Sequence, residues 1–138
     1  MKKHETQLPG LEIFDLELIG EGEKGATHTF HNDRTGKFIL GTRKAGTFNG
    51  NHFHTGKEAN KNPEIFILLK GKVRFQTKDL NTGEMGEAVL EAPLRIHILP
   101  YCWHAVTAIS EIVFLELNSI NEHASDTLYE HNMKPEFN

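Results

Sequence analysis

The sequence has a single cysteine, no long apolar run and no excess of positive charge. Cys102 cannot form an internal disulfide, which is typical of a reducing compartment, and we interpret it as a reduced thiol in or beside the core. No run of about 20 apolar residues occurs, and residues 1–16 contain no stretch resembling a signal peptide. With 15 Lys and Arg against 19 Asp and Glu, the net charge is −4, which gives no electrostatic reason to expect nucleic acid or an anionic membrane as a partner. We therefore expect a cytoplasmic protein with neither partner.

Before about residue 118 the sequence also lacks a convincing helical period. Short segments rich in β-branched and aromatic residues are instead separated by glycine, proline and asparagine, and they predict strands at 11–19, 37–43, 64–70, 72–78, 94–99, 103–109 and 111–117. Many short strands favour an antiparallel barrel or sandwich over a parallel α/β sheet. The 138 residues have the length of one domain, so we expect a single all-β domain over 1–138. Its C-terminal tail is short and polar, with at most a short helix around 124–130.

One glycine-rich stretch, Gly20 to Gly25, matches the GxGxxG pattern of dinucleotide-binding turns. The residues that follow it are poor in helix formers, so no helix N-terminus would meet a pyrophosphate, and Glu21 and Glu23 would repel one. We interpret the match as accidental.

The nine histidines carry more information, because imidazole binds metals and exchanges protons near neutral pH. His52 and His54 are two residues apart, so on a strand they would point to the same face, about 7 Å apart. If Glu64 opens a neighbouring strand and His104 lies on a later one, all four side chains can converge inside the fold. Three imidazoles and a carboxylate suit one divalent metal ion such as Zn, Fe, Ni or Mn, and the ligand types alone do not choose among them.

These residues resemble the first histidine motif of the cupin superfamily, in which a glycine precedes an HxH pair and a glutamate precedes a second glycine. Five residues separate Gly46 from His52, and six separate Glu64 from Gly71, as the motif requires. Nine residues (TGKEANKNP) stand between His54 and Glu64, where cupins usually have three or four. Glu58 satisfies that shorter spacing and is the alternative carboxylate, but a strand start holds a ligand more rigidly, so we favour Glu64.

The second cupin motif is resembled by Leu99 to Val106, in which Pro100, Trp103 and His104 keep the register of a PPGxWH sequence. Tyr101 stands where that sequence has glycine. Together the two motifs cover about residues 37–117, so the resemblance implies a cupin jelly-roll β-barrel with its core there and the metal set His52, His54, Glu64 and His104.

A narrower resemblance concerns residues 36–54. Lys44, Gly46, Gly50 and Asn51, followed by the HxH pair, are similar to a signature in nucleotide-sugar-modifying cupins, notably the C-terminal domain of capsular polysaccharide reductase-epimerases. This resemblance implies isomerisation or epimerisation of a small carbohydrate derivative, a keto-sugar nucleotide, and it implies a homodimer.

Such proton transfer needs a base and a donor facing the developing enolate. We expect His97 and Tyr101 to move the proton, and Arg95, which shares a strand face with His97, to meet a diphosphate. Weaker phosphate candidates are Arg34, Arg43 and Lys44. We assign no role to the histidines in polar or terminal segments, namely His4, His28, His31, His123 and His131.

Three other functions remain compatible with the sequence. A metal-dependent dioxygenase would use the same ligands around Fe(II). A sugar-binding or sensor cupin would bind a ligand without turnover. A metal-free epimerase would use histidine alone as the proton carrier.

Overall fold

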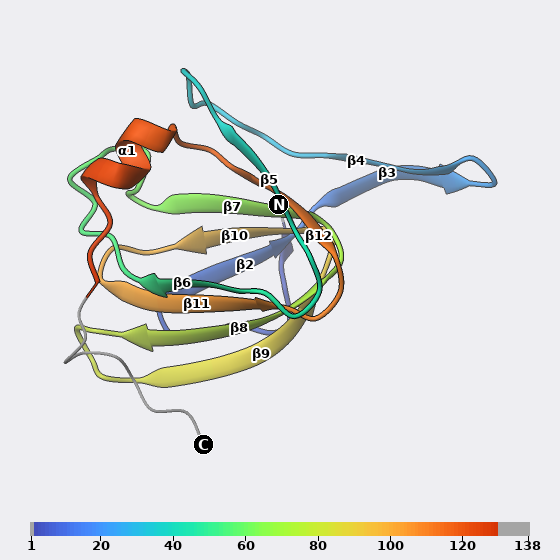
Figure 1. Cartoon of the computed structure of the whole chain (residues 1–138). Coiled ribbons are helices and arrows are strands. Elements are labelled where there is room, and N and C mark those ends of the chain that lie inside the picture. Colours follow the sequence, from blue (N-terminus) through green and yellow to red (C-terminus); the bar gives the residue numbers. More distant parts are fainter. Residues whose placement is uncertain (1, 130–138) are drawn as a thin grey trace.

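The protein is built mainly from strands, with one short helix. The strands are β1 (Lys2–Lys3), β2 (Leu11–Asp15), β3 (Glu17–Gly22), β4 (Gly25–Thr29), β5 (Ile39–Arg43), β6 (Phe48–His52), β7 (Glu64–Lys70), β8 (Lys72–Asp79), β9 (Met85–Glu91), β10 (Leu94–Ile98), β11 (Cys102–Ala108) and β12 (Ile112–Glu116), and the helix is α1 (Ile120–Ser125). The computed structural model, drawn in Figure 1, describes residues 2–129.

Two large antiparallel sheets contain most of these strands. The six-stranded sheet has the order β1-β2-β10-β7-β12-β5, and the four-stranded sheet has the order β6-β11-β8-β9. β3 and β4 form a separate hairpin, which extends away from the two large sheets (Figure 1).

The main hydrophobic core lies between the two large sheets. Phe66, Ile96 and Phe114 enter it from the six-stranded sheet, and Phe75 and Val106 enter it from the four-stranded sheet. Along the first part of β8 buried residues alternate with more exposed ones, as a strand with one face on a core requires. The apolar faces of the two sheets therefore hold the molecule together.

Strand β7 is buried on both of its faces. A second apolar cluster on the opposite side of the six-stranded sheet contains Ile65 and Ile67 together with Leu16 and Leu117. Because β7 has cover on either side, its first residue, Glu64, is buried as well. The fold thus places a carboxylate at the start of a central strand.

The expected mainly-β antiparallel fold is confirmed, and each predicted strand segment overlaps an observed strand. The segment 11–19 divides at Leu16, since β2 stays in the sheet while β3 leaves it for the hairpin. The predicted segments do not include β1, β4, β6 or β9. Within residues 2–129 no strand belongs to both large sheets, so closure into a barrel stays a prediction.

The helix differs from the expected one at 124–130. It begins after Ser119, which accepts a hydrogen bond from the backbone of Glu122, while the Glu122 side chain accepts one from the backbone of Ser119. This capping box fixes the start of α1 four residues earlier than expected. Residues 130–138, which include the rest of the expected tail and His131, lie outside the described residues.

The GxGxxG match lies in the β3–β4 hairpin, and no helix follows it. A hairpin turn offers no helix N-terminus to a pyrophosphate. Cys102 belongs to the main core, and burial raises the pKa of its thiol to about 12, which fits an inert core thiol. Between residues 2 and 129 no helix is long and apolar enough to cross a membrane.

Candidate functional site

A cavity of about 220 Å³ lies between the two large sheets. One wall is apolar and includes the rings of Phe66, Phe75 and Phe114. The polar and charged residues of the lining are Arg43, Asn49, His52, Glu64, His104, Glu116, His123 and Tyr129. Since pockets for drug-sized ligands measure roughly 300–1,000 Å³, this cavity encloses only part of such a ligand.

A bulge in β6 brings His52 opposite His104. In the pairing of β6 with β11, His52 faces His104 and Gly50 faces Ala105, so Asn51 is an extra residue. Gly50 and Asn51 both have positive φ angles, of 88° and 64°. A Cβ on Gly50 would lie 2.9 Å from the backbone oxygen of His104, so only glycine permits this close approach.

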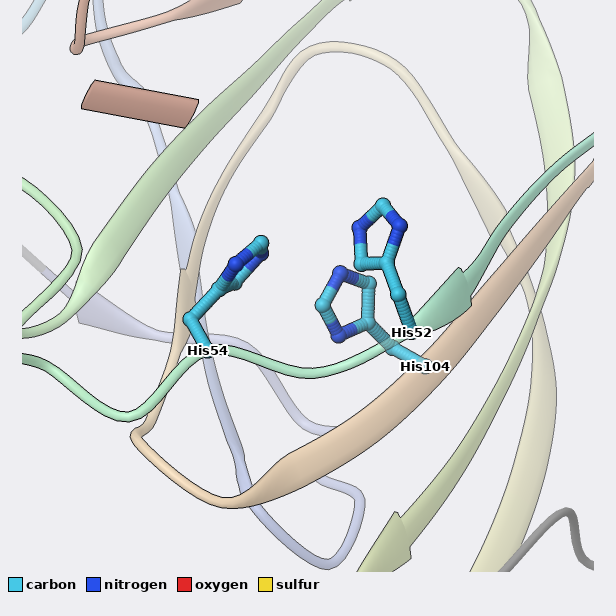
Figure 2. A group of neighbouring side chains, drawn as sticks. All are labelled: His52, His54 and His104. Atoms are coloured by element: carbon cyan, nitrogen blue, oxygen red, sulfur yellow. The ribbon is translucent and has the colours of Figure 1, made fainter. Parts of the chain in front are cut away.

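Three buried imidazoles converge at this end of the cavity (Figure 2). The ring of His52 lies 4.9 Å from that of His54 and 4.8 Å from that of His104, measured between centroids. One ring nitrogen from each histidine lies within 4.8 Å of the others, a separation that one metal ion can span. The structure thus brings together all three histidines of the predicted metal set.

Two of these imidazoles have their tautomer fixed by backbone carbonyls. Nδ1 of His54 donates to the carbonyl of Asp126 (2.6 Å), and Nδ1 of His104 donates to the carbonyl of Cys102 (2.9 Å). A carbonyl only accepts, so each Nδ1 carries a proton and each neutral ring keeps its lone pair on Nε2. Outer hydrogen bonds of this kind orient histidines that bind metals.

Glu64 is the fourth member of the predicted set, and it lies against the same two nitrogens. Its Oε2 is 2.7 Å from Nε2 of His54 and 3.6 Å from Nε2 of His104. Its Oε1 accepts a hydrogen bond from Nζ of Lys61, which is fully buried. Burial raises the pKa of Glu64, but a positive charge at its contact with His54, together with the charge of Lys61, outweighs burial and brings that pKa well below its ordinary value. Glu64 is therefore a carboxylate at neutral pH.

The other cavity groups have pKa values shifted mainly by burial. Burial lowers the pKa of His52 to about 2 and those of His104 and His123 to about 4, so these imidazoles are neutral at pH 7. Burial, together with the negative charge of Glu64, raises the pKa of Glu116 to about 7. Neutral imidazoles are the form that binds metals, and a carboxyl with a pKa near 7 suits proton transfer.

No protein-family model matches this sequence, and no curated protein does either. Solved structures match over most of the chain. The QdtA 3,4-ketoisomerase from Thermoanaerobacterium thermosaccharolyticum, in complex with TDP, has a TM-score of 0.70 and 18% identity over 93% of both chains. The 3,5-epimerase RmlC from Legionella pneumophila, in complex with dTDP-4-keto-L-rhamnose, has a TM-score of 0.66 and 15% identity over 93% of this chain and 76% of its own. The RmlC epimerase of Mycobacterium tuberculosis has a TM-score of 0.69 and 15% identity over 94% of this chain and 72% of its own.

This chain has the RmlC-like cupin fold. The resemblance inferred from the two histidine motifs is thereby confirmed for the fold. At this level of identity the likeness concerns the fold and does not by itself assign an activity.

Tyr101 departs from the second cupin motif, but the turn keeps the backbone geometry that the motif glycine would have. Tyr101, in the position of the motif glycine, adopts a φ of 61°, in the left-handed region that glycine favours. Its backbone N–H donates to the carbonyl of His54 (2.7 Å), so this turn supports the first motif.

The insertion between His54 and Glu64 is held in place by a residue of the C-terminal segment (residues 118–129). The carboxylate of Asp126 accepts hydrogen bonds from the backbone N–H groups of Thr55, Gly56 and Glu58. The side chain of Glu58 accepts a hydrogen bond from Ser125 and does not line the cavity. The structure therefore places Glu64, rather than Glu58, against the histidines.

The expected roles of His97 and Tyr101 need correction, because the structure brings neither side chain to the cavity. Ile96 and Ile98 face the core, so the intervening His97 lies on the opposite face of β10, where it contacts Arg95 and Glu12. The side chain of Tyr101 is 43% exposed and packs beside the ring of Phe53.

The cationic candidates are also separated by the structure. Arg95 donates to His31 and His97 on the outer face, and Arg34 donates to backbone carbonyls of the insertion and of Leu117. Lys44 is exposed and does not line the cavity. Arg43 alone among these candidates lines it, stacked over the ring of Phe114.

The sequence-based reasoning missed several residues of the site. No sequence pattern points to His123, yet its ring centroid lies 5.4 Å from that of His52. No pattern points to Lys61, Glu116 or Tyr129 either. A lysine three residues before Glu64 was the one visible signal, since burial of the glutamate would require a partner.

Proposed function

We propose that this protein binds one divalent metal ion through His52, His54, Glu64 and His104, and that it isomerises or epimerises a keto-sugar nucleotide by proton transfer. One observation carries the metal site. Nε2 of His54 and Oε2 of Glu64 are both buried, lie 2.7 Å apart, and have no hydrogen-bond partner among residues 2–129 other than each other. Nδ1 of His52 is buried there without a partner too.

A positive charge is needed where these atoms meet. With Nδ1 of His54 protonated, a neutral ring presents a lone pair to a carboxylate oxygen, and two acceptors repel at this distance. A divalent ion shared by the imidazoles and the carboxylate removes the repulsion, and the donor set fits Zn, Fe, Ni or Mn.

The same contact supports a second candidate, a metal-free isomerase. A proton on Nε2 of His54 would make an imidazolium paired with Glu64, and that arrangement needs no ion. The two candidates differ in metal content and in their response to chelation.

The substrate class is supported by the cavity and by the proteins of similar fold. The ketoisomerase and epimerase above are described with TDP and with dTDP-4-keto-L-rhamnose, and another structure of that ketoisomerase contains TDP-4-keto-6-deoxyglucose. Here Arg43 supplies a cation to the cavity lining, where it can bind a phosphate, and Tyr129 offers an aromatic ring to a sugar or a base.

Glu116 is the residue best suited to take the proton next to the ketone. It lines the cavity, and its pKa of about 7 lets a carboxylate and a carboxylic acid interconvert at neutral pH. A bound divalent ion would act as a Lewis acid toward the substrate oxygen.

Proton NMR in heavy water tests this proposal with dTDP-4-keto-L-rhamnose and TDP-4-keto-6-deoxyglucose as probes. The expected result is solvent deuterium at a carbon beside the ketone. His52→Ala should abolish the exchange, and His97→Ala, on the outer face, should leave it unchanged. Loss of exchange after chelation, with recovery on adding metal, supports the metal enzyme, and exchange that survives exhaustive chelation supports the metal-free isomerase.

Two other outcomes identify the remaining alternatives. Oxygen uptake by the Fe(II) form would indicate a dioxygenase, and saturable binding of both probes without exchange would indicate a sugar-binding or sensor protein.

The homodimer also stays a prediction. It is supported by the exposed Leu18 and Ile19 of the hairpin and Leu40 of the edge strand β5, and sedimentation equilibrium tests it. The cytoplasmic location likewise stays a prediction.

A further inference from the structure

We infer that His123 is a substrate-contacting residue whose Nε2–H donates a hydrogen bond to the substrate's keto oxygen, and that Lys61 is the positioning residue that fixes this tautomer. The inference rests on the proposed function, because it names an additional participant in the same proton transfer. Neither residue belongs to the two histidine motifs.

The position of His123 is fixed from several directions. Its helix α1 starts at the capping box of Ser119 and Glu122, and the Glu122 side chain also accepts a hydrogen bond from Asn60 in the insertion. The hydroxyl of Thr127 donates to the backbone carbonyl of His123. The ring lines the cavity, with its centroid 5.4 Å from that of His52.

The proton on the His123 ring is placed by Lys61. Nζ of Lys61 lies 2.9 Å from Nδ1 of His123 and 3.0 Å from Oε1 of Glu64. Nζ of Lys61 donates to the Glu64 carboxylate, and a lysine ammonium has no lone pair with which to accept. Nδ1 of His123 is therefore the acceptor, so the ring is neutral and its proton is on Nε2.

Nε2 of His123 is free to contact a ligand. Among residues 2–129 no side chain or backbone group is seen hydrogen-bonded to it, and His123 lines the cavity, where a ligand could meet this nitrogen. A neutral imidazole is an effective donor to a carbonyl whose oxygen gains negative charge.

The proposed step is balanced without any further reactant. Glu116 takes the proton from the carbon beside the ketone, the electrons of the broken C–H bond form the C–C double bond of the enolate, and the charge moves to the keto oxygen. His123 stabilises that oxygen through its N–H and keeps its proton. For epimerisation, a proton from solvent is then added to the opposite face of the same carbon, and Glu116 releases its proton to solvent. For ketoisomerisation, the proton of the neighbouring hydroxyl moves to the keto oxygen, and Glu116 returns its proton to the former keto carbon.

A first experiment examines the imidazole without turnover, by ¹⁵N NMR at pH 7. The His123 signal is assigned from its loss in His123→Phe. The expected spectrum has a protonated Nε2 and an unprotonated Nδ1, and Lys61→Met should give a mixture of the two tautomers. A proton on Nδ1 in the wild type would overturn the inference, even if Lys61→Met fails to fold.

A second experiment measures deuterium exchange into the two keto-sugar probes. His123→Phe should lower kcat about 100-fold with KM changed less than about threefold, as for loss of one preorganised donor. His123→Gln, which keeps an N–H donor, should retain more activity than His123→Phe, and the control His97→Gln should match the wild type. A kcat of His123→Phe within twofold of the wild type would overturn the inference.

Failure of the proposed function is distinguishable from failure of this inference. If the wild type exchanges no deuterium, the proposed function fails, and the ¹⁵N spectrum in the presence of TDP-4-keto-6-deoxyglucose then decides. A shift of the His123 Nε2 signal on adding the probe supports the contact with the keto-sugar, and an unchanged signal overturns it.

Discussion

Two groups of polar side chains in this protein have similar composition but differ in how their atoms are paired. The cavity cluster consists of His52, His54, Glu64 and His104, and three of its buried nitrogen and oxygen atoms have no hydrogen-bond partner within the described part of the chain, residues 2–129. The outer cluster consists of Glu12, Arg95 and His97 on the other face of the six-stranded sheet.

In the outer cluster the polar atoms face suitable partners. Nε of Arg95 donates to Nε2 of His97 (2.9 Å), and Nδ1 of His97 lies 3.7 Å from the Glu12 carboxylate. Buried polar groups without partners are costly, so they persist where a ligand or ion satisfies them. The outer cluster therefore needs no ligand to satisfy its polar atoms, whereas the cavity cluster does.

The largest expected difference between the clusters is in metal affinity. His52→Ala removes one of four proposed ligands, so the affinity should fall by more than the roughly 10–100-fold that follows loss of an outer partner. The thermal midpoint should fall with it when metal is present, because a ligand of the folded state adds to the free energy of unfolding. Competition with a chelating dye measures the affinity, and His97→Ala is the matched control. Equal occupancy in wild type and His52→Ala would remove His52 from the site.

A smaller effect is expected at Asp126, which supports the cavity cluster from outside. Its carboxylate accepts hydrogen bonds from the insertion, and its backbone carbonyl accepts from Nδ1 of His54. Asp126→Ala should lower the free energy of unfolding by about 2–3 kcal/mol and metal affinity by about tenfold. Urea denaturation and the chelator assay measure these changes. Asp15→Ala, at a partly exposed carboxylate, is the control, and equal losses in both variants would contradict the account.

The stability of the metal-free protein should next depend on pH, through the titratable groups that line the cavity. The pKa values of His52, His104 and His123 fall from 6.5 to about 2, 4 and 4 on folding. The unfolded chain then binds more protons, so the free energy of unfolding falls as pH drops from about 7 toward 4. The pKa of Glu116 rises from 4.5 to about 7 on folding. Its ionisation therefore lowers the free energy of unfolding as pH rises through this range, which is the opposite direction to the histidines.

Between pH 4.5 and 6.5 three histidines therefore oppose one glutamate, and the net result is loss of stability on acidification. The thermal midpoint of chelator-treated protein at pH 7.5, 6 and 5 checks this, with a weaker dependence expected for His123→Gln. A midpoint that stays constant or rises toward pH 5 would contradict the assigned shifts.

The smallest effect is expected in the outer cluster. Glu12→Gln removes a charge from a pair that is partly exposed to water, so the free energy of unfolding should change by about 1 kcal/mol or less. Metal affinity should not change. A loss of metal affinity in Glu12→Gln would mean that the two clusters are coupled through the sheet.

The fold and the centre of the cavity cluster could be predicted because their signals are local. Alternating apolar residues define the strands, and the spacing of His52, His54, Glu64 and His104 matches a known pair of motifs. The structure places these four side chains together. The long insertion did not obscure Glu64, because a buried strand follows it directly.

The remaining residues could not be predicted because their placement depends on tertiary contacts. His123 lies in the helix α1 and not in a strand, and Asp126 and Leu128 hold the C-terminal segment that carries it against the insertion and Phe53. The sequence does not show which face of β10 carries His97. A shift of one residue moves a side chain to the other face of a sheet, so the expected role of His97 depended on an unknown register. Sequence spacing thus located the four side chains of the cavity cluster but not the groups around them.

The most direct test is elemental analysis of protein purified without a metal-affinity tag, followed by titration of the chelated protein with Zn, Mn, Ni and Fe(II). The account predicts about one divalent ion per chain in the wild type and its loss in His52→Ala. The account would be contradicted if metal-free wild type takes up none of these ions and its imidazole NMR signals stay unchanged throughout the titration.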